Sequence, residues 1–376
     1  MRSNLLPAPV RGAARADLVE RQLHRYCPRF QGAVRALAMR HARIADIAVS
    51  FPALLFALAV PRPGLDPALA LELAIEGIAL AEVAAAAGMP LWLRRLPPEM
   101  FAYPIMKLPD GELFRRQIAN HLPRSPKLAP IWLRAVADVA DLAYEAVAVW
   151  IARELVRDVK RVKLDRLRLI SLWAWFSGQP GTLGQKMIER PWMPAMRIGS
   201  ALAAADDWRM KIALHVNLGR EPIADMWLQS ARVGDFDFLP LASPAAIAEE
   251  AAAMKNCLCS YGYNLAHNRS RLWSVRKDGR RVATLSVASR HQDPLPNITQ
   301  LMTANNTKAS PEVWWAARRW LHMHDLPQID MKRRDWGTAP LVRDAWISIW
   351  RPYWLAKRRI PEWLPMAASR KALATL

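Results

Sequence analysis

The sequence predicts an α+β protein that is predominantly α-helical, with a helical N-terminal region followed by a small antiparallel three-stranded sheet flanked by helices. Apolar residues recur at steps of three and four through most of the first 240 residues, which is typical of helices. After Pro240 the pattern changes to alternation around a turn signal, which is typical of strands. With 376 residues, of which 52% are hydrophobic and 23% charged, the chain can bury a core. This composition excludes a disordered, collagen-like or disulfide-scaffold protein.

The first 240 residues are expected to form a succession of helices. An apolar stripe runs through residues 13–44, where Pro28 is expected to kink or split the helix. Residues 47–60 form the longest uncharged apolar stretch, and we expect a buried helical hairpin there because a bilayer requires roughly 20 residues. Further helices are expected over residues 66–88, 111–121 and 130–176, with a proline-rich connector over residues 89–110.

The sequence predicts a cytoplasmic chain without a transmembrane segment. Three glutamates interrupt the apolar residues 69–87, which argues against a spanning helix there. The three cysteines, Cys27, Cys257 and Cys259, are few and odd in number, which favours a reducing compartment. No apolar run followed by a small-residue cleavage site is found near the N-terminus.

The C-terminal part is expected to fold as helix, three-stranded meander and helix. Ser243 is a good N-cap for a helix over residues 244–256. Residues 271–288 alternate on either side of Asp278-Gly279, a strong hairpin-turn signal, and residues 298–303 are expected to form the third strand. Ser310 caps a final helix to about residue 324. We therefore expect a helical region over 1–240, an α+β domain over 241–325 and a basic, tryptophan-rich tail over 326–376.

The net charge of +20 is unevenly distributed along the sequence. Residues 1–44 carry a net charge of +7, residues 45–250 carry none, and residues 251–376 carry +13. Such a surplus attracts polyanions, so nucleic acid is the leading candidate partner and an anionic membrane surface is the second. The alternative is that the surplus reflects only an arginine-favouring composition.

Basic and polar residues of the C-terminal part are the candidate nucleic-acid contacts. They surround the predicted hairpin, the end of the third strand and the tail, and they are Arg269, Arg271, Arg276, Lys277, Arg280, Arg281, Gln300, Asn305, Asn306, Lys308, Lys332, Arg333, Arg334, Lys357, Arg358 and Arg359. Basic side chains bind phosphates, and the tryptophans between them can stack on bases. For most of these tryptophans a core position is the better interpretation, since Trp346, Trp350 and Trp354 recur at steps of four.

Five short segments in order resemble one known family. They are Asn256-Cys257-Leu258-Cys259-Ser260-Tyr261, Leu272-Trp273-Ser274-Val275-Arg276, Ala283-Thr284-Leu285-Ser286-Val287, Ile298-Thr299-Gln300 and Asn305-Asn306. Over roughly residues 240–325 the chain resembles the PcfJ-like domain family of conjugative plasmids, phages and bacterial chromosomes. The resemblance implies a mobile-element context and no assigned reaction. Lys255, Cys259 and Ser286 stand where family members often have histidine, glycine and glutamate.

Cys257 is a candidate nucleophile, with Lys255 and Tyr261 as further candidate catalytic residues. A neighbouring base or positive charge activates a thiol, and Lys255 and His267 are near in sequence. The alternative is that Cys257 and Tyr261 pack under the sheet, because free cysteine is often buried. An open Cys257 with Lys255 or His267 in reach would favour chemistry.

No metal or cofactor is expected. The pairs Cys257/Cys259 and His322/His324 have only one residue between their members, whereas structural zinc sites use wider spacings. Phosphate-binding, dinucleotide-binding and hydrolase motifs are not found in the sequence. The sequence therefore predicts a PcfJ-like, nucleic-acid-associated protein of unassigned activity. A cysteine-dependent enzyme and a protein–protein adaptor that uses the helical region stay open as alternatives.

Overall fold

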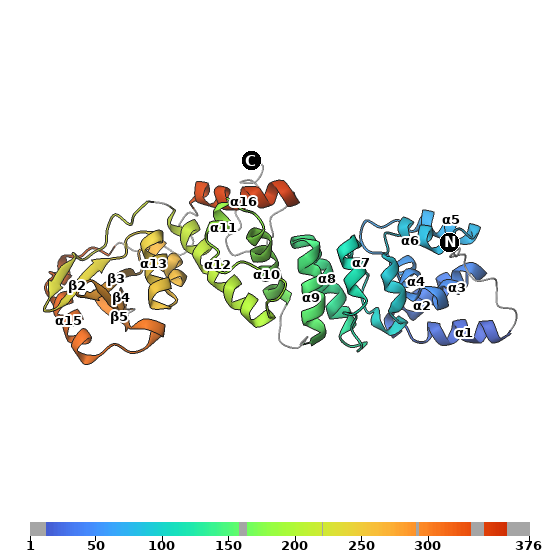
Figure 1. Cartoon of the computed structure of the whole chain (residues 1–376), viewed down its shortest axis with the longest axis horizontal. Helices are drawn as coiled ribbons and strands as arrows, with labels where there is room; N and C mark the ends of the chain where they lie inside the picture. The colour runs from blue at the N-terminus through green and yellow to red at the C-terminus, as the bar shows by residue number, and fades with distance from the viewer. Residues whose placement is uncertain (1–12, 158–163, 220, 291–292, 332–341, 359–376) are drawn as a thin grey trace. The chain divides into compact units, whose positions relative to one another are not determined.

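Helices make up most of the structure, and one antiparallel sheet lies in the C-terminal half of the chain (Figure 1). This computed structural model describes residues 13–157, 164–219, 221–290, 293–331 and 342–358. The chain divides into two compact units. Unit 1 comprises Met1–Gly178 and Pro191–Leu202, and unit 2 comprises Gln179–Arg190 and Ala203–Leu376. The limits expected at residues 240 and 325 stay predictions as domain boundaries.

The described residues of unit 1 form helices and the segments that connect them, without a strand. Its α-helices are α1 (Ala13–Leu23), α2 (Pro28–Ala38), α3 (Ala42–Ser50), α4 (Pro52–Ala59), α5 (Ala68–Glu76), α6 (Leu80–Ala86), α7 (Glu112–Ile118), α8 (Ala129–Leu142), α9 (Glu145–Arg157) and α10 (Leu164–Ser177), with short 3-10 turns at Leu91–Arg95 and Pro98–Met100. Pro28 begins α2 and so separates it from α1. The expectation of buried helices over residues 47–60 is confirmed for α4, where every residue except Ala59 is buried; in the end of α3 that precedes it, Val49 is 42% exposed.

Two long helices expected from the sequence are interrupted in the structure. The helix expected over residues 66–88 is broken by Gly77, whose φ of +83° ends α5 in the left-handed conformation. The helix expected over 130–176 is divided into α8, α9 and α10. Between α8 and α9 the backbone of Ala143 leaves the helical region, with φ −114° and ψ −130°. The next two residues instead bond to other helices: the Tyr144 hydroxyl donates to the Ala174 carbonyl, and the Glu145 carboxylate accepts from the Phe114 N–H.

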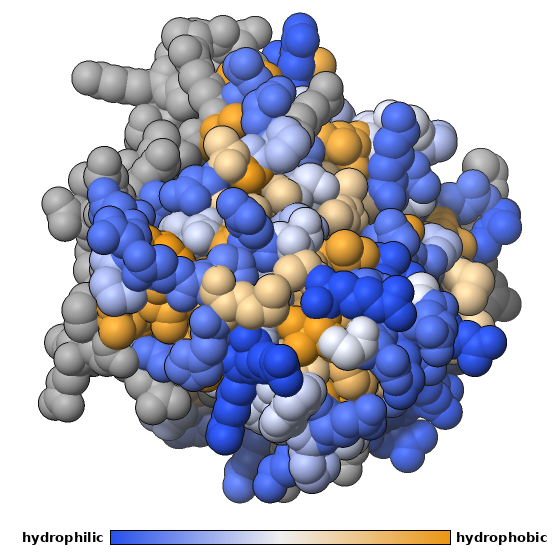
Figure 2. Space-filling view, turned by 90° about the vertical axis from the view of Figure 1, so that its left-hand side faces the viewer, coloured by the Kyte–Doolittle hydropathy of each residue, from blue (hydrophilic) through white to orange (hydrophobic). Residues whose placement is uncertain are grey.

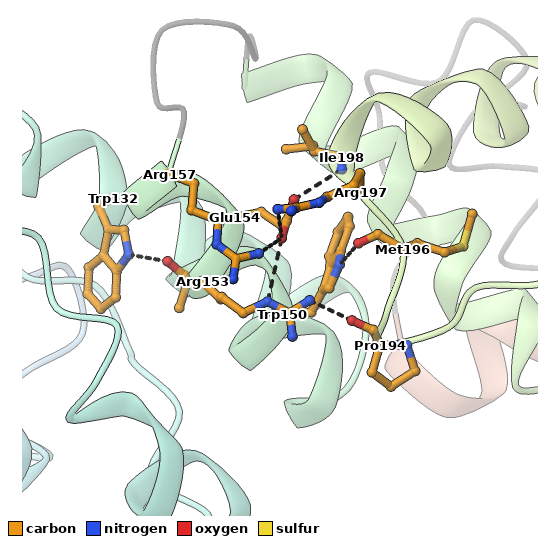
Figure 3. A network of polar contacts seen from close by, with 10 residues as sticks. Trp132, Trp150, Arg153, Glu154, Arg157, Pro194, Met196, Arg197 and Ile198 are labelled. Atoms are coloured by element: carbon orange, nitrogen blue, oxygen red, sulfur yellow. Dashed lines mark hydrogen bonds and ion pairs between the residues drawn. The ribbon is translucent and has the colours of Figure 1, made fainter.

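A buried carboxylate on α9 gathers three arginines. Glu154 is only 3% exposed and forms ion pairs with Arg157 at 3.1 Å, Arg153 at 3.5 Å and Arg197 at 3.9 Å (Figure 3). Burying a charge is unfavourable unless it is paired and hydrogen-bonded. The arginines supply that compensation while their own side chains stay partly in solvent.

The same carboxylate holds the returning segment Pro191–Leu202 in unit 1. The Ile198 N–H, at the start of α12 (Ile198–Leu218), donates to Glu154 Oε2 at 3.2 Å (Figure 3). The indole of Trp150 donates to the Met196 carbonyl at 2.8 Å. A carboxylate at a helix N-terminus satisfies an otherwise unpaired N–H and interacts favourably with the helix dipole. These bonds explain why residues 191–202 belong with α9 despite their distance along the chain.

Unit 2 contains the sheet and further helices. Besides the later part of α12 it has α11 (Leu183–Lys186), α13 (Pro244–Met254), α14 (Gly262–Ala266), α15 (Pro311–His322) and α16 (Arg343–Lys357), with 3-10 turns η4 (Leu258–Tyr261), η5 (Ala304–Asn306) and η6 (Leu326–Gln328). Its strands are β1 (Ala231–Val233), β2 (Phe236–Pro240), β3 (Arg271–Lys277), β4 (Arg280–Arg290) and β5 (Asp293–Met302). On α16, Trp346 and Trp350 are fully buried, which confirms the core interpretation for these two.

The expected sheet of three strands is wrong, because the described residues form five. The strand order is β1-β2-β3-β4-β5 and every neighbouring pair is antiparallel. The two added strands lie within residues 231–240, in the part of the chain expected to be helical. They are short, and β1 and β2 are joined by a turn at Gly234 with φ +58°. The predicted hairpin is confirmed: Asp278 and Gly279 both have positive φ between β3 and β4, as a tight hairpin turn requires.

The two faces of the sheet differ in character. On one face, Trp273, Val275, Ala283, Leu285 and Val287 are buried against α15. The opposite face carries Leu272 beneath α13, and beside it polar residues of β3 and β4, namely Ser274, Thr284 and Ser286. Figure 1 shows α13 and α15 on opposite sides of the strands. The alternation of the strands therefore builds one apolar face and one that is partly polar.

Among the described residues, no helix combines the length and the apolar character that crossing a membrane would require.

Candidate functional site

A shallow polar cavity lies on the second face of the sheet and brings most of the family-like segments together. Its lining comes from the chain after α13, from β4, from the end of β5 and from η5, and includes Asn256, Cys257, Tyr261, Thr284, Ser286, Gln300 and Asn306. Its volume is about 20 Å³, which is room for one or two water molecules. Sites for whole small molecules usually exceed about 300 Å³. The cavity can thus accept a single polar group of a ligand that lies across it.

Hydrogen bonds organise this cavity. The Tyr261 hydroxyl donates to Gln300 Oε1 at 2.5 Å, and the Asn256 amide donates to the Thr284 hydroxyl at 3.1 Å. Burial raises the pKa of Tyr261, while its hydrogen bond with Ser286 acts in the opposite direction. Tyr261 is therefore a protonated hydrogen-bonding group at neutral pH. Two hydrogen-bonding residues of the cavity were absent from the predicted site: Thr284, which bonds to Asn256, and Ser286, which bonds to Tyr261. The alternation of β4 places both opposite the buried apolar residues of that strand.

Cys257 is exposed at the mouth of the cavity. The alternative in which it packs beneath the sheet therefore does not describe its side chain. Lys255 and His267, the two groups expected to activate Cys257, do not line the cavity. Lys255 ends α13 with a left-handed backbone and an exposed side chain. His267 is 2% exposed, and its Nδ1 lies 2.9 Å from the Tyr263 carbonyl oxygen.

Cys259 occupies an opposite environment, within the apolar cluster beneath α13. It is 3% exposed, and burial raises the pKa of its thiol to about 11. A thiol in that state is a poor nucleophile at neutral pH.

Arg271, one of the predicted nucleic-acid contacts, is buried inside unit 2. It is 1% exposed, and its guanidinium donates to the Asp225 carbonyl, the Ser270 carbonyl and the Asn268 side chain. The guanidinium also lies over the Trp227 ring, 4.2 Å from its centroid. A side chain so placed supports the fold and does not extend to a phosphate in solvent.

Two further basic residues of the hairpin are paired with carboxylates. Lys277 lies 3.2 Å from Asp235 and 3.6 Å from Glu312, and these partners, Asp235 first, raise the pKa of the lysine. Arg281 donates to Glu250 at 2.8 Å and also pairs with Glu249. Glu250 is fully buried. The charges of Lys277 and Arg281 are thus largely compensated within the protein.

The other predicted contacts are dispersed over unit 2. Gln300 and Asn306 line the polar cavity, and Asn305 lies beside them with a left-handed backbone. Arg280 and Lys308 are exposed and form no ion pair with another described residue, whereas Arg276 is half-buried and donates to the Ser274 hydroxyl. Of the remaining predicted contacts, Arg269 is half-buried on the chain just before β3, and Lys357 and Arg358 stand at the end of α16. Four others lie outside the described residues: Lys332, Arg333, Arg334 and Arg359.

The outer face of α15 carries basic and aromatic residues that the predicted site omits. Arg318 lies over Trp314 at 5.7 Å from the ring centroid, and Arg319 lies over Trp315 at 5.2 Å. Trp315 is 57% exposed. Both arginines are exposed, and neither forms an ion pair with another described residue. We call these four residues the α15 face.

Figure 2 shows the side of the molecule that is on the left in Figure 1, where α15 is drawn. Hydrophilic residues predominate there, and hydrophobic residues show between them in small groups. The sequence did contain a signal for the α15 face. Trp314 and Arg318, like Trp315 and Arg319, are four residues apart, a spacing that brings two side chains together on a helix surface. None of the four is among the buried residues of α15.

Within the described part of the chain, no three histidine, cysteine, aspartate or glutamate side chains converge as metal ligands would. His324 is engaged in the fold, since its Nε2 accepts a hydrogen bond from the Gln229 N–H at 3.0 Å. No protein-family model, curated protein or solved structure matches this chain.

Proposed function

We propose that this chain is a PcfJ-like protein of mobile genetic elements that binds single-stranded nucleic acid through unit 2. The observation that carries the proposal is the α15 face, where two exposed arginines without carboxylate partners stack on tryptophans. The resemblance of residues 240–325 to the PcfJ-like family supplies the mobile-element context. The surplus of basic residues supports an anionic partner.

The α15 face supplies both interactions that single-stranded binders use. Guanidinium groups attract the phosphates, and an exposed indole such as Trp315 stacks on an unpaired base whatever its sequence. Trp314 is half-buried against the core and supports Arg318. The stacked arrangement also holds each guanidinium in place before binding, which reduces the conformational entropy lost on association. In the hairpin, by contrast, Lys277 and Arg281 are already compensated by carboxylates.

Fluorescence anisotropy with a labelled 20-nucleotide single strand of mixed sequence tests the proposal. The full chain should bind this strand, and Trp315→Ala should weaken binding about tenfold because base stacking contributes roughly 1–3 kcal/mol. The matched control is Leu355→Ala, which removes a similarly exposed apolar side chain from α16. Absence of binding at about 0.1 M salt, or equal losses in both variants, would contradict the proposal.

A cysteine-dependent reaction is the second candidate function, favoured by the exposure of Cys257 beside a polar cavity. Tyr261 and Gln300 supply hydrogen-bonding groups there, and Lys255 is the nearest cation in sequence. We expect that an alkylating reagent would modify Cys257 without abolishing nucleic-acid binding, since α15 packs on the other face of the sheet. Should a reaction of this protein be found, full retention of its rate in Cys257→Ala would eliminate this candidate.

A further inference from the structure

A cavity large enough for a small molecule lies in unit 1, far along the chain from the proposed nucleic-acid surface. An open cavity of about 400 Å³ is bordered by α8, the start of α10 and the irregular segment of residues 100–108. Its size falls within the roughly 300–1,000 Å³ typical of small-molecule sites. All of its lining residues belong to unit 1.

The body of the cavity is apolar. Buried side chains of Met100, Ile105, Leu108 and Leu133 line it, and the exposed Tyr103 stands at its rim. The four buried side chains offer no strong hydrogen-bond partner, so they favour a hydrocarbon or aromatic body. The charged groups are confined to the helices.

Three charged side chains line this helical side: Arg134 and Asp138 on α8, and Arg168 on α10. Arg168 is committed to carboxylates, at 3.3 Å from Asp138 and 3.6 Å from Asp165. Arg134 lies one turn before Asp138 and is exposed, without a hydrogen bond or ion pair to another described residue. The cavity therefore has one uncompensated positive charge beside an apolar interior.

We propose that this cavity binds an apolar monocarboxylate, a molecule with a hydrocarbon body and a single carboxylate at one end. The body fills the space between Met100, Ile105 and Leu133, and the carboxylate accepts hydrogen bonds from the Arg134 guanidinium. The planar guanidinium matches a carboxylate with two parallel hydrogen bonds. This site is independent of the proposed nucleic-acid binding.

The charges also exclude other ligand classes. Asp138 would repel a dianion such as a phosphate monoester, whereas a monoanion can stay on the Arg134 side of the Arg168–Asp138 pair. A cationic ligand would meet two guanidinium groups. A neutral ligand of the same shape gains only the burial of its apolar surface and leaves Arg134 without a partner.

Calorimetric titration of the full chain with decanoate and with decanol tests the proposal. Decanoate should bind about tenfold more tightly than decanol, the difference expected for a charge-assisted hydrogen bond. Arg134→Gln should reduce the affinity for decanoate to that for decanol. Arg124→Gln is the matched control, because Arg124 is an exposed arginine of the same unit that does not line the cavity.

Two more variants locate the site and keep the test decisive. Asp138→Asn should strengthen decanoate binding severalfold, because it releases Arg168 from its partner. Ala102→Trp should abolish binding of both ligands by filling the cavity, with circular dichroism as the check of folding. Equal affinities for decanoate and decanol, no binding of decanoate, or full binding in a folded Ala102→Trp variant would overturn the proposal.

Discussion

Cys257 and Cys259 are two residues apart and have opposite surroundings. The first is exposed at the polar cavity, and the second is buried in the apolar cluster beneath α13. Burial disfavours the charged thiolate of Cys259 and raises its pKa from its ordinary value of 9.0 to about 11. In the folded protein this thiol stays protonated through the neutral and mildly alkaline range.

We predict that a disulfide-exchange reagent will distinguish these thiols in a Cys27→Ser background. At pH 8 Cys257 should react in the native protein at a rate near that of an exposed thiol, and Cys259 only after unfolding. Because the folded pKa of Cys259 is raised, its slow reaction should persist up to about pH 10 and accelerate as the pH approaches 11. Native labelling of two thiols at pH 8, with the position verified by Cys257→Ser, would contradict this assignment.

The residues of the polar cavity were largely predictable from sequence, and the charge pairing of the hairpin was not. Cys257, Tyr261, Gln300 and Asn306 were all singled out, and the fold brings them to one cavity. The pairing escaped prediction because the carboxylates come from other elements. Arg281 of β4 is compensated by two glutamates of α13, which no local spacing indicates.

At the scale of elements, the sequence predicted helices well and their interruptions less well. The apolar pattern of residues 130–176 continues across Ala143, so periodicity gave no sign of the break between α8 and α9. The break depends on tertiary hydrogen bonds of Tyr144 and Glu145, which periodicity does not contain. Strands β1 and β2 were missed because they have three and five residues, too few for a clear alternation.

Glu154 is expected to hold α9 and the start of α12 together. Replacement by Gln removes the charge that offsets three arginines, and we expect it to lower the free energy of unfolding by about 2 kcal/mol. The matched control is Glu112→Gln, whose ion pair with Arg116 is 75% exposed and should contribute less than about 0.5 kcal/mol. Urea denaturation followed by circular dichroism measures both. Similar losses in the two variants would mean that burial of Glu154 adds nothing to its pairing.

At the scale of the whole molecule, the basic surplus is shared by the two units. Unit 1 contains 26 basic and 16 acidic residues, and unit 2 contains 27 and 17, so each carries +10. The value of +13 for residues 251–376 overstated the asymmetry, because the acidic residues of 203–250 fold into the same unit. Net charge therefore does not indicate which unit binds an anionic partner. The better indication is a surface where basic side chains lack carboxylate partners, such as the α15 face. An adaptor role for the helical region stays a prediction.

The most direct test of nucleic-acid binding through the α15 face is the salt dependence of the affinity for single-stranded DNA. The slope of log K against log salt changes by about 0.7 for each phosphate that the protein no longer neutralises. An Arg318→Gln/Arg319→Gln double variant should therefore flatten the slope by about 1.4. A Lys277→Gln/Arg281→Gln double variant, which removes the same formal charge from compensated positions, should leave the slope within about 0.5 of the wild-type value. Equal flattening in both double variants, or flattening only in the second, would contradict binding through the α15 face.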